Sequence, residues 1–421
     1  MPSPYRAIFT APGTASFSVA GFLGRMPLSM MGIGIVTMIS QVTGRYGLAG
    51  ALSATLAMSA AVLGPRVSRL VDQHGQRKVL RPVALVSLAA GAGLLLCVQQ
   101  RAPDWTLFVF TAAIGCVPSI GAMTRARWAE IYRGEQRRLH TAYSWESIVD
   151  EVCFVFGPII SIGLSTAWFP EAGPLFAGAF LAVGVFWLTS QRATEPQPHP
   201  RVQGTRGDSA LRSPGLQVLA LAFVATGAVF GSVDVVTVAF AEEQGRKTAA
   251  SLVLAVYALG SCLAGAVFGL FHFKGEPSRR WTLGVCAMAV SMIPLLLVGN
   301  LPLLAVALFV AGLSIAPTMV TTMALVEAHV PRTKLTEGMT WTSTGLAIGV
   351  ALGSAAAGWV VDTSGAEAGY VVPVVSGALA VAVGLLGNRR LRRPAPKREG
   401  QREQDDDSGA GELRGGEQAV A

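Results

Sequence analysis

Charged side chains are scarce in this chain. Asp, Glu, Lys and Arg make up 14% of its 421 residues, against about 25% in a soluble domain, and 15 of the 58 charges fall in residues 389–421. The mean hydropathy of the chain is +0.50. A single soluble core stops growing at about 250–300 residues, so it would not bury this much apolar sequence. The composition excludes a soluble enzyme and a disordered chain, and it predicts a protein that crosses a membrane many times.

Motifs for nucleotide, metal and nucleophile chemistry are also missing. There is no G-x-x-x-x-G-K-[ST] loop, no H-E-x-x-H, no paired-Asp motif of the prenyl-transfer kind and no serine nucleophile elbow. The five cysteines lie in apolar runs without a C-x-x-C pair or a nearby histidine cluster, which is typical of small core residues. We therefore expect neither an enzyme nor a cofactor or metal site. A channel is disfavoured because one such chain offers no selectivity ring.

Twelve apolar runs are long enough for membrane helices, which need about 20 residues each. The first contains Arg25 and no small-residue cleavage site, so we interpret it as a span and not as a signal peptide. Of the 33 Lys and Arg residues, 28 fall on one side of the predicted membrane and four on the other. This asymmetry predicts that both termini are cytoplasmic, and it explains the net charge of +8 without nucleic acid. The predicted spans are 17–40, 46–67, 79–99, 104–124, 141–167, 173–190, 214–241, 248–271, 281–299, 301–326, 335–361 and 368–388.

The longest polar segment in the interior, residues 191–213, predicts a flexible linker. It separates an N-terminal bundle, residues 1–190, from a C-terminal bundle, residues 214–388, and a charged, Gly-rich tail at 389–421 is predicted to be disordered. The halves echo each other at Trp145 and Trp341, at Gly157 and Gly353, and at Pro118-Ser119 and Pro317-Thr318. Equal helix counts and these echoes predict an all-α integral membrane fold of two pseudo-symmetric six-helix bundles.

The loop between the second and third predicted spans carries a motif. It reads Ser68-Arg-Leu-Val-Asp72-Gln-His-Gly75-Gln-Arg77-Lys78-Val-Leu80. This resembles the signature loop G-x-L-x-D-R-x-G-R-R-x-x-L of the major facilitator superfamily. The matching residues are Asp72, Gly75, Arg77 and Leu80, and the departures are Ser68, Gln73 and Gln76. The corresponding loop of the second half, residues 269–280, lacks the Asp.

The resemblance implies a secondary transporter whose two halves rock about a central cavity lined by the first, fourth, seventh and tenth spans. It also implies that Asp72, Gly75 and Arg77 form a conformational latch on the cytoplasmic side, which favours the outward-open state. Gly75 permits a backbone turn that a side chain would block. Asp72 either pairs with Arg77 or faces the N-terminus of another helix. The alternative is an ordinary positive-inside loop in which Asp72 is solvated.

Four charges are candidates for positions in mid-membrane, namely Arg25, Asp150, Glu151 and Asp234. A charge in mid-membrane costs at least about 2.5–3.5 kcal/mol, so each needs a partner or water. Arg25 and Glu151 lie about 12 and 15 Å along their helices, which predicts a pair of Arg25 with Glu151 or with Asp150. Adjacent carboxylates point about 100° apart, so the second acid stays free to bind and release a proton. The alternative is a static ion pair. Asp234, near the outer end of the seventh span, either gates that end or is solvated there.

Three dipeptides inside the spans predict bends next to the cavity: Pro118-Ser119, Gly157-Pro158 and Pro317-Thr318. Gly157-Pro158 is similar to the antiporter motif of drug exporters in the superfamily, although the surrounding glycines of that motif are missing. The fourth predicted span lacks the mid-membrane arginine that many proton-coupled members of the superfamily carry. Our hypothesis is that Arg25 takes that role.

The predicted function is proton-coupled export of a small amphiphilic compound across the cell membrane. The apolar spans, with few polar residues in mid-membrane, favour a greasy compound over a sugar. The expected partners are this small molecule, protons and the lipid bilayer, and one chain suffices as a monomer. Two alternatives stay open, which are proton-coupled uptake of a small solute and a non-transporting sensor or partner protein with the same fold.

Overall fold

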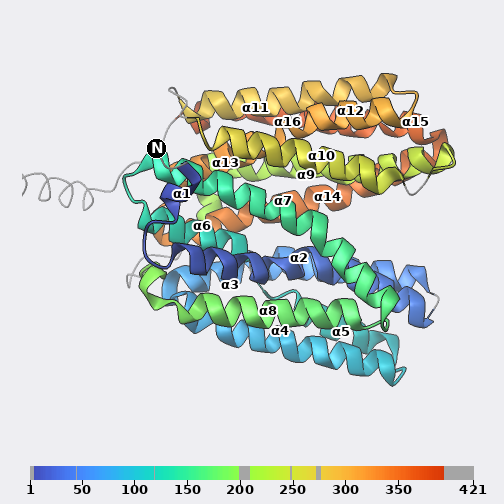
Figure 1. Cartoon of the computed structure of the whole chain (residues 1–421), viewed down its shortest axis with the longest axis horizontal. Helices are drawn as coiled ribbons and strands as arrows, with labels where there is room; N and C mark the ends of the chain where they lie inside the picture. Colours follow the sequence, from blue (N-terminus) through green and yellow to red (C-terminus); the bar gives the residue numbers. More distant parts are fainter. Residues whose placement is uncertain are drawn as a thin grey trace, which may run out of the picture.

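The computed structural model of the chain consists of helices that run along one long axis (Figure 1). It describes residues 4–43, 45–117, 119–198, 209–246, 249–271 and 276–392. Ten helical stretches in this part of the chain are long and apolar enough to cross a membrane. Two shorter apolar helices, Asp104–Ile114 and Leu252–Phe268, lie at the positions of the fourth and eighth predicted spans. The prediction of an all-α membrane protein with twelve spans is confirmed.

The first six spans follow a short helix at the N-terminus. The short helix is α1 (Pro4–Ile8). The helices of the spans are α2 (Thr14–Thr43), α3 (Tyr46–His74), α4 (Gln76–Gln99), α5 (Asp104–Ile114), α6 (Ile120–Ile131), α7 (Gln136–Ala167) and α8 (Ala172–Ser190). Two short 3₁₀ helices, η1 (Arg192–Thr194) and η2 (Ala210–Arg212), lie in the described ends of the predicted linker. Residues 199–208 of the linker lie outside the described residues.

The second six spans repeat this order. Their helices are α9 (Pro214–Glu243), α10 (Ala249–Phe268), α11 (Pro277–Met292) with η3 (Ile293–Leu297), α12 (Leu301–Gly312), α13 (Ile315–His329), η4 (Arg332–Lys334), α14 (Leu335–Ser364), α15 (Ala366–Gly369) and α16 (Val371–Leu391). α16 continues three residues beyond the predicted end of the last span. Residues 393–421 of the predicted tail lie outside the described residues, so disorder there stays a prediction.

The fourth span is broken, and the end predicted for it is wrong. α5 and α6 are separated by residues 115–119. Ser119 caps α6, because its Oγ accepts a hydrogen bond from the backbone N–H of Ala122 at 3.3 Å. α6 then continues seven residues past the predicted end. Arg125 and Arg127, which the sequence assigns to the following loop, are therefore helical and buried.

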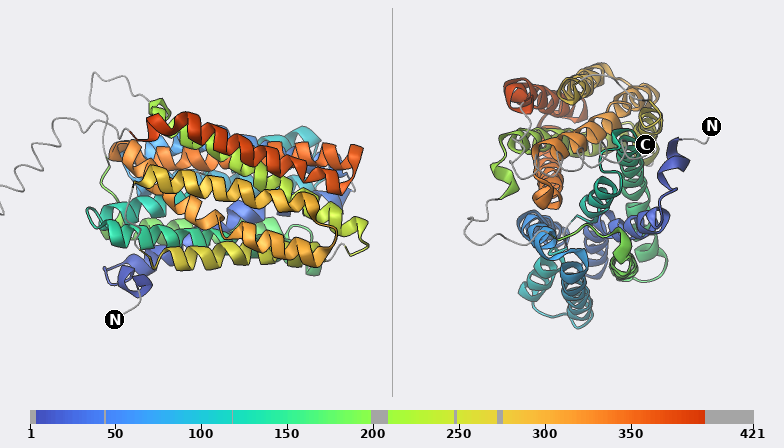
Figure 2. Two further views of the ribbon diagram at one scale, coloured as in Figure 1. Left: turned by 90° about the horizontal axis from the view of Figure 1, so that it is seen from above. Right: turned by 90° about the vertical axis from the view of Figure 1, so that its left-hand side faces the viewer.

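The helices gather into two groups that meet side by side. Figure 1 draws α2 to α5 and α8 in its lower part and α10 to α12 and α16 in its upper part, and the end-on view of Figure 2 separates the same groups. The groups meet where α3 packs on α14 and where α7 packs on α10 and α13. We call the end that holds α1, α6, η4 and the turn between α3 and α4 the basic end of the bundle. It lies at the left in Figure 1.

The first and fifth spans approach each other closely in both groups. A Cβ added to Gly157 of α7 would overlap Oγ of Ser29 on α2. A Cβ added to Gly353 of α14 would overlap the carbonyl oxygen of Ala228 on α9. The two glycines that echo each other in the sequence thus occupy equivalent helix contacts, as expected of pseudo-symmetric bundles. Pro158, beside the first of them, lies inside α7.

Candidate functional site

A buried guanidinium joins α2 to α7. Arg25 is 3% exposed, and its two terminal nitrogens bind two carboxylates of α7. Nη1 lies 2.8 Å from Oδ1 of Asp150, and Nη2 forms an ion pair with Oε2 of Glu146. The two acids are one helical turn apart, so they present their carboxylates on the same face. Of the two predicted partners of Arg25, Asp150 is confirmed, whereas pairing with Glu151 is wrong.

α6 completes this cluster with a second arginine. Nη2 of Arg125 lies 2.5 Å from Oδ2 of Asp150. Oγ1 of Thr124 and Nε1 of Trp128 donate hydrogen bonds of 2.8 and 2.7 Å to the two carboxylate oxygens of Glu146. Buried charges are tolerated when they are paired and hydrogen-bonded in this way. Two arginines and two carboxylates form a balanced network, which we call the charge cluster.

The charge cluster contains two groups that the sequence analysis did not assign. Glu146 carried a signal, since it stands one turn before Asp150 on the same helical face. No feature of the sequence marked Arg125, because the fourth span predicted from hydropathy ends before it and leaves it in the following loop. The fourth span thus contains a buried arginine, Arg125, on its second helix.

Glu151 lies outside the charge cluster. Its Oε1 accepts a hydrogen bond of 2.6 Å from Oγ of Ser261 on α10, which belongs to the other group of helices. Tyr257 stands one turn before Ser261, is only 7% exposed, and has a hydroxyl without a hydrogen-bond partner among the described residues. The Tyr257 ring lies 6.5 Å from the ring of Phe230 on α9, between centroids, and Asp234, one turn after Phe230, is exposed. Neither of these two acids has an ion-pair partner in the described part of the chain.

The predicted bends lie at or near breaks in two spans. Pro118 lies outside the described residues, and Ser119 is the N-cap of α6. In the tenth span, α12 ends two residues before α13 begins, and Pro317 lies in the first turn of α13. Oγ1 of Thr318 donates a 2.7 Å hydrogen bond to the carbonyl oxygen of Ser314 at this break. The fourth and tenth spans are therefore interrupted at corresponding places.

At the basic end, α3 is bonded to the first turn of α14. The carboxylate of Asp72 accepts hydrogen bonds from the backbone N–H groups of Thr336, at 3.3 Å, and Glu337, at 2.9 Å. Asp72 was predicted either to pair with Arg77 or to face the N-terminus of another helix, and the second is confirmed. A carboxylate at this place also meets the positive end of the helix dipole. Arg77 contributes through its backbone N–H, which donates to Oε1 of Glu195 at 2.9 Å.

The same contact contains an ion pair that the sequence analysis missed. Nε and Nη2 of Arg69 bind the two oxygens of Glu337 at 3.1 and 2.8 Å, a bidentate arrangement. Glu337 is fully buried, and Oγ of Ser209 also donates to it at 2.6 Å. The nearby hydroxyls of Ser68 and Thr340 lie 2.8 Å apart. These bonds and those of Asp72 make up what we call the α3–α14 contact.

Gly75 supports the turn that follows. Its φ is +92°, in the region that favours glycine, and an added Cβ would lie 3.0 Å from Oε1 of Glu195. Burial raises the pKa of the Glu195 carboxyl, and the nearby Arg127 guanidinium opposes this shift. A side chain at position 75 would strain the turn and crowd the acid that binds the start of α4.

A second contact between the two groups of helices joins α7 to the end of α10. Its hydrogen bonds use carbonyl oxygens in place of a carboxylate. Oγ1 of Thr141 donates to the carbonyl oxygen of Gly269 at 3.0 Å, and Nε2 of His140 lies 2.9 Å from that of Phe268. The Tyr5 hydroxyl of α1 reaches the carbonyl oxygens of Gly265 and Ala266 at 3.0 and 2.9 Å. Burial raises the pKa of Tyr5 to about 12, which keeps it a donor at neutral pH. We call this the α7–α10 contact.

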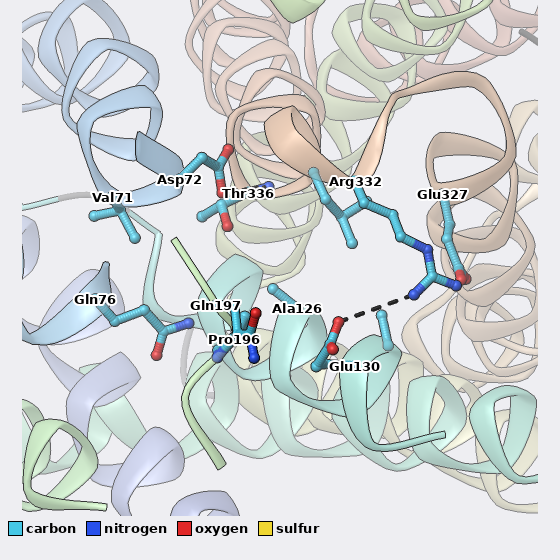
Figure 3. A pocket seen from close by; sticks show the side chains of 12 residues that line it. Val71, Asp72, Gln76, Ala126, Glu130, Pro196, Gln197, Glu327, Arg332 and Thr336 are labelled. Carbon is cyan, nitrogen blue, oxygen red and sulfur yellow. Dashed lines mark hydrogen bonds and ion pairs between the residues drawn. The ribbon is translucent and has the colours of Figure 1, made fainter. Parts of the chain in front are cut away.

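A small pocket lies between the two groups of helices at the basic end (Figure 3). Its lining includes Glu130 of α6, Glu327 of α13 and Arg332 of η4. Arg332 reaches Glu130 at 3.9 Å, the dashed line of Figure 3, and the Tyr143 hydroxyl donates to Glu327 at 3.2 Å. The pocket is thus next to the α3–α14 contact, because Asp72 and Thr336 also line it.

Comparison with known families decides the identity. The family model described as Major Facilitator Superfamily matches residues 17–298 and 219–417. The chain belongs to the Major Facilitator Superfamily. It is a multi-pass membrane protein and a secondary transporter, and not an enzyme.

Solved transporters share the fold of this Major Facilitator Superfamily chain. The human organic anion transporter MFSD10 (TETRAN) matches with a TM-score of 0.66 at 15% identity, covering 90% of this chain and all of that one. A bacterial homologue of the iron transporter ferroportin, outward-facing with soaked iron, reaches 0.70 at 13% identity over 89% of this chain and 98% of its own. The Escherichia coli fucose:proton symporter reaches 0.65 at 11% identity over the same shares. At these identities the likeness extends to the fold alone.

Proposed function

We propose that this transporter exports a small amphiphilic compound in exchange for protons, and that Glu151 carries the proton. The observation behind the proposal is that Glu151 is separated from the balanced charge cluster and bonded to Ser261 in the other bundle. A charged Glu151 accepts that hydrogen bond, whereas protonation removes the charge that strengthens it. The titratable groups facing Glu151 are Asp150 on its own helix, Tyr257 and Cys262 on α10, and Asp234 beyond Tyr257.

The other predicted residues take supporting roles in this proposal. Arg25 and Asp150 hold α2, α6 and α7 together beside the proton carrier. Asp234 stands on the opposite bundle and completes the acidic pair. Ser119, Gly157, Pro158, Pro317 and Thr318, with Pro118, allow the spans to bend. Because the first and fifth spans already pack tightly at Gly157, movement there is expected to be a tilt of whole helices.

We propose that the basic end faces the cytoplasm of the cell, with both termini on that side. The support is the excess of Lys and Arg in the segments at this end. Asp72, Gly75 and Arg77 then belong to a cytoplasmic latch, and Arg69 and Glu337 strengthen it. We also propose that the chain divides into two bundles, residues 1–190 and 214–388, with a linker at 191–213 and a tail at 389–421. We propose that it transports as a monomer.

Accumulation of amphiphilic dyes in cells without their own pumps tests the proposal. Intact protein is compared with Glu151→Gln and with Asp362→Asn, which changes an exposed acid at the far end of α14. We expect lower accumulation with intact protein and Asp362→Asn, and no export with Glu151→Gln or with a protonophore. Higher accumulation would replace export by uptake. Equal accumulation in all cells, with the protein in the membrane, would favour a non-transporting protein.

A second pair of variants tests the latch. Asp72→Asn weakens the hydrogen bonds to the first turn of α14, so the transport rate should fall while the amount of protein in the membrane is unchanged. Asp104→Asn is the control, since Asp104 forms an exposed ion pair with Arg45 at the other end of the bundle. Equal transport by the two variants would contradict a latch at Asp72.

A further inference from the structure

The ionisable groups inside the membrane do not balance. Arg25 and Arg125 neutralise Glu146 and Asp150 within the charge cluster. Two more carboxylates, Glu151 on α7 and Asp234 on α9, have no cation in the described part of the chain. Uncompensated charges within a membrane are expensive and mark functional sites. These two acids therefore require either protons or a positively charged ligand.

An unsatisfied hydroxyl lies on α10, which packs against the helices of both acids. Tyr257 of α10 is buried, and its hydroxyl has no hydrogen-bond partner among the described residues. It stands one turn before Ser261, the partner of Glu151. The ring of Phe230, one turn before Asp234 on α9, meets the Tyr257 ring edge-on at 6.5 Å between centroids. Two acids, an open hydroxyl and two aromatic rings thus lie on the packed helices α7, α9 and α10, linked by the Glu151–Ser261 bond and the Phe230–Tyr257 contact.

We propose that Glu151, Asp234 and Tyr257 bind the cationic group of the transported compound, which makes the substrate an amphiphilic organic cation. This inference rests on the proposed function and names its substrate class. A cation would supply the missing charge, and aromatic rings attract cations through their faces. An anion would meet two carboxylates and no free arginine. A metal ion is disfavoured because no group of three His, Cys, Asp or Glu residues suited to one exists in the described residues.

The arrangement also gives a reason for exchange. Protons and an organic cation satisfy the same carboxylates, so they compete for one site. Glu151 and Asp234 belong to different bundles, and a bound cation would hold both. Release of the cation leaves the two carboxylates uncompensated, and their protonation removes that charge for the return.

Three aromatic probes of similar size and different charge test the inference on purified protein in detergent. They are tetraphenylphosphonium, a cation, tetraphenylborate, an anion, and triphenylphosphine oxide, which is neutral. We expect tetraphenylphosphonium to bind at least about tenfold more tightly than the other two, and to be displaced as the pH falls. Glu151→Gln and Asp234→Asn should each weaken its binding by about tenfold, and Asp362→Asn should leave it unchanged. Tyr257→Phe, which keeps the ring, should weaken it by a smaller factor.

Equal binding of the three probes to intact protein would overturn the inference, and this comparison needs no variant. Cation binding that survives in the double variant Glu151→Gln, Asp234→Asn would overturn it as well. Different results refute the proposed function and the substrate class. Proton-driven export of neutral dyes without cation selectivity would refute the substrate class alone, whereas selective cation binding without any proton-driven export would support the site and refute the coupling.

Discussion

The contact between the first and fifth spans is built differently in the two bundles. In the first bundle, α2 meets α7 through Arg25 and the carboxylates of Glu146 and Asp150. In the second bundle, α9 meets α14 through glycines spaced four apart, whose added Cβ atoms would strike backbone carbonyl oxygens of α9. These are Gly345, Gly349 and Gly353. Small residues at this spacing let membrane helices pack backbone to backbone.

The two bundles are therefore expected to differ in how the strength of this contact depends on pH. The α9–α14 contact contains no titratable group at these positions, so its strength does not depend on pH. The α2–α7 contact is held by charges, and it adjoins Glu151, the acid proposed to carry the proton. We expect the second bundle to move as a rigid frame, and the first to respond to protonation.

The largest expected effect is that of Arg25→Leu. It leaves Glu146 and Asp150 with Arg125 as their remaining cation, and breaking a buried ion pair on one side costs about 3–5 kcal/mol. We expect a strongly lowered melting temperature of the purified protein. Arg45→Leu, which removes an exposed ion pair with Asp104, should change it little. Similar decreases in melting temperature for the two variants would contradict the view that the charge cluster holds the first bundle together.

Gly349→Ala is expected to destabilise the second bundle by about 1–3 kcal/mol, the usual cost of overpacking. The added methyl group would overlap the carbonyl oxygen of Val224, a backbone atom that no rotamer change can move aside. Gly358→Ala on the same helix is the control, because an added Cβ there meets nothing within 4 Å. If thermal unfolding in detergent gives the two variants the same stability, the backbone contact of α9 and α14 is looser than described.

Gly157→Ala should cost less, on the order of 1 kcal/mol. The atom nearest to its added methyl group is Oγ of Ser29, which is able to rotate away, while the Ser29 Cβ would stay 2.9 Å from it. Ser29→Gly in the same chain should recover part of the loss, and the double-mutant cycle measures how much. Additive losses in that cycle would show that Ser29 is not what limits the approach of α2 to α7.

Much of the fold was predictable from the sequence, because hydropathy and the positive-inside rule depend on runs of residues. Arg25 and Asp150 stood out as charges within apolar runs, and their depths along two helices agreed. Arg125 and Glu337 were not recognised, because Arg125 lies just beyond the predicted end of the fourth span and Glu337 lies in the first turn of α14, where a hydropathy window does not separate a buried charge from a loop residue. The partner of Asp72 was left as two alternatives, since both are local chemistry and only the packing of α14 decides between them.

Tyr5 gives the molecule a spectroscopic handle. Its hydroxyl is held by the end of α10, while its ring and that of Phe9 lie 6.5 and 5.4 Å from the indole of Trp145 on α7. When α10 moves away from α7, either these hydrogen bonds break or α1 leaves the indole, and the second event exposes Trp145 to water. The chain has eight tryptophans, so a variant that keeps only Trp145 would report by its fluorescence which of the two breaks first, without any attached dye.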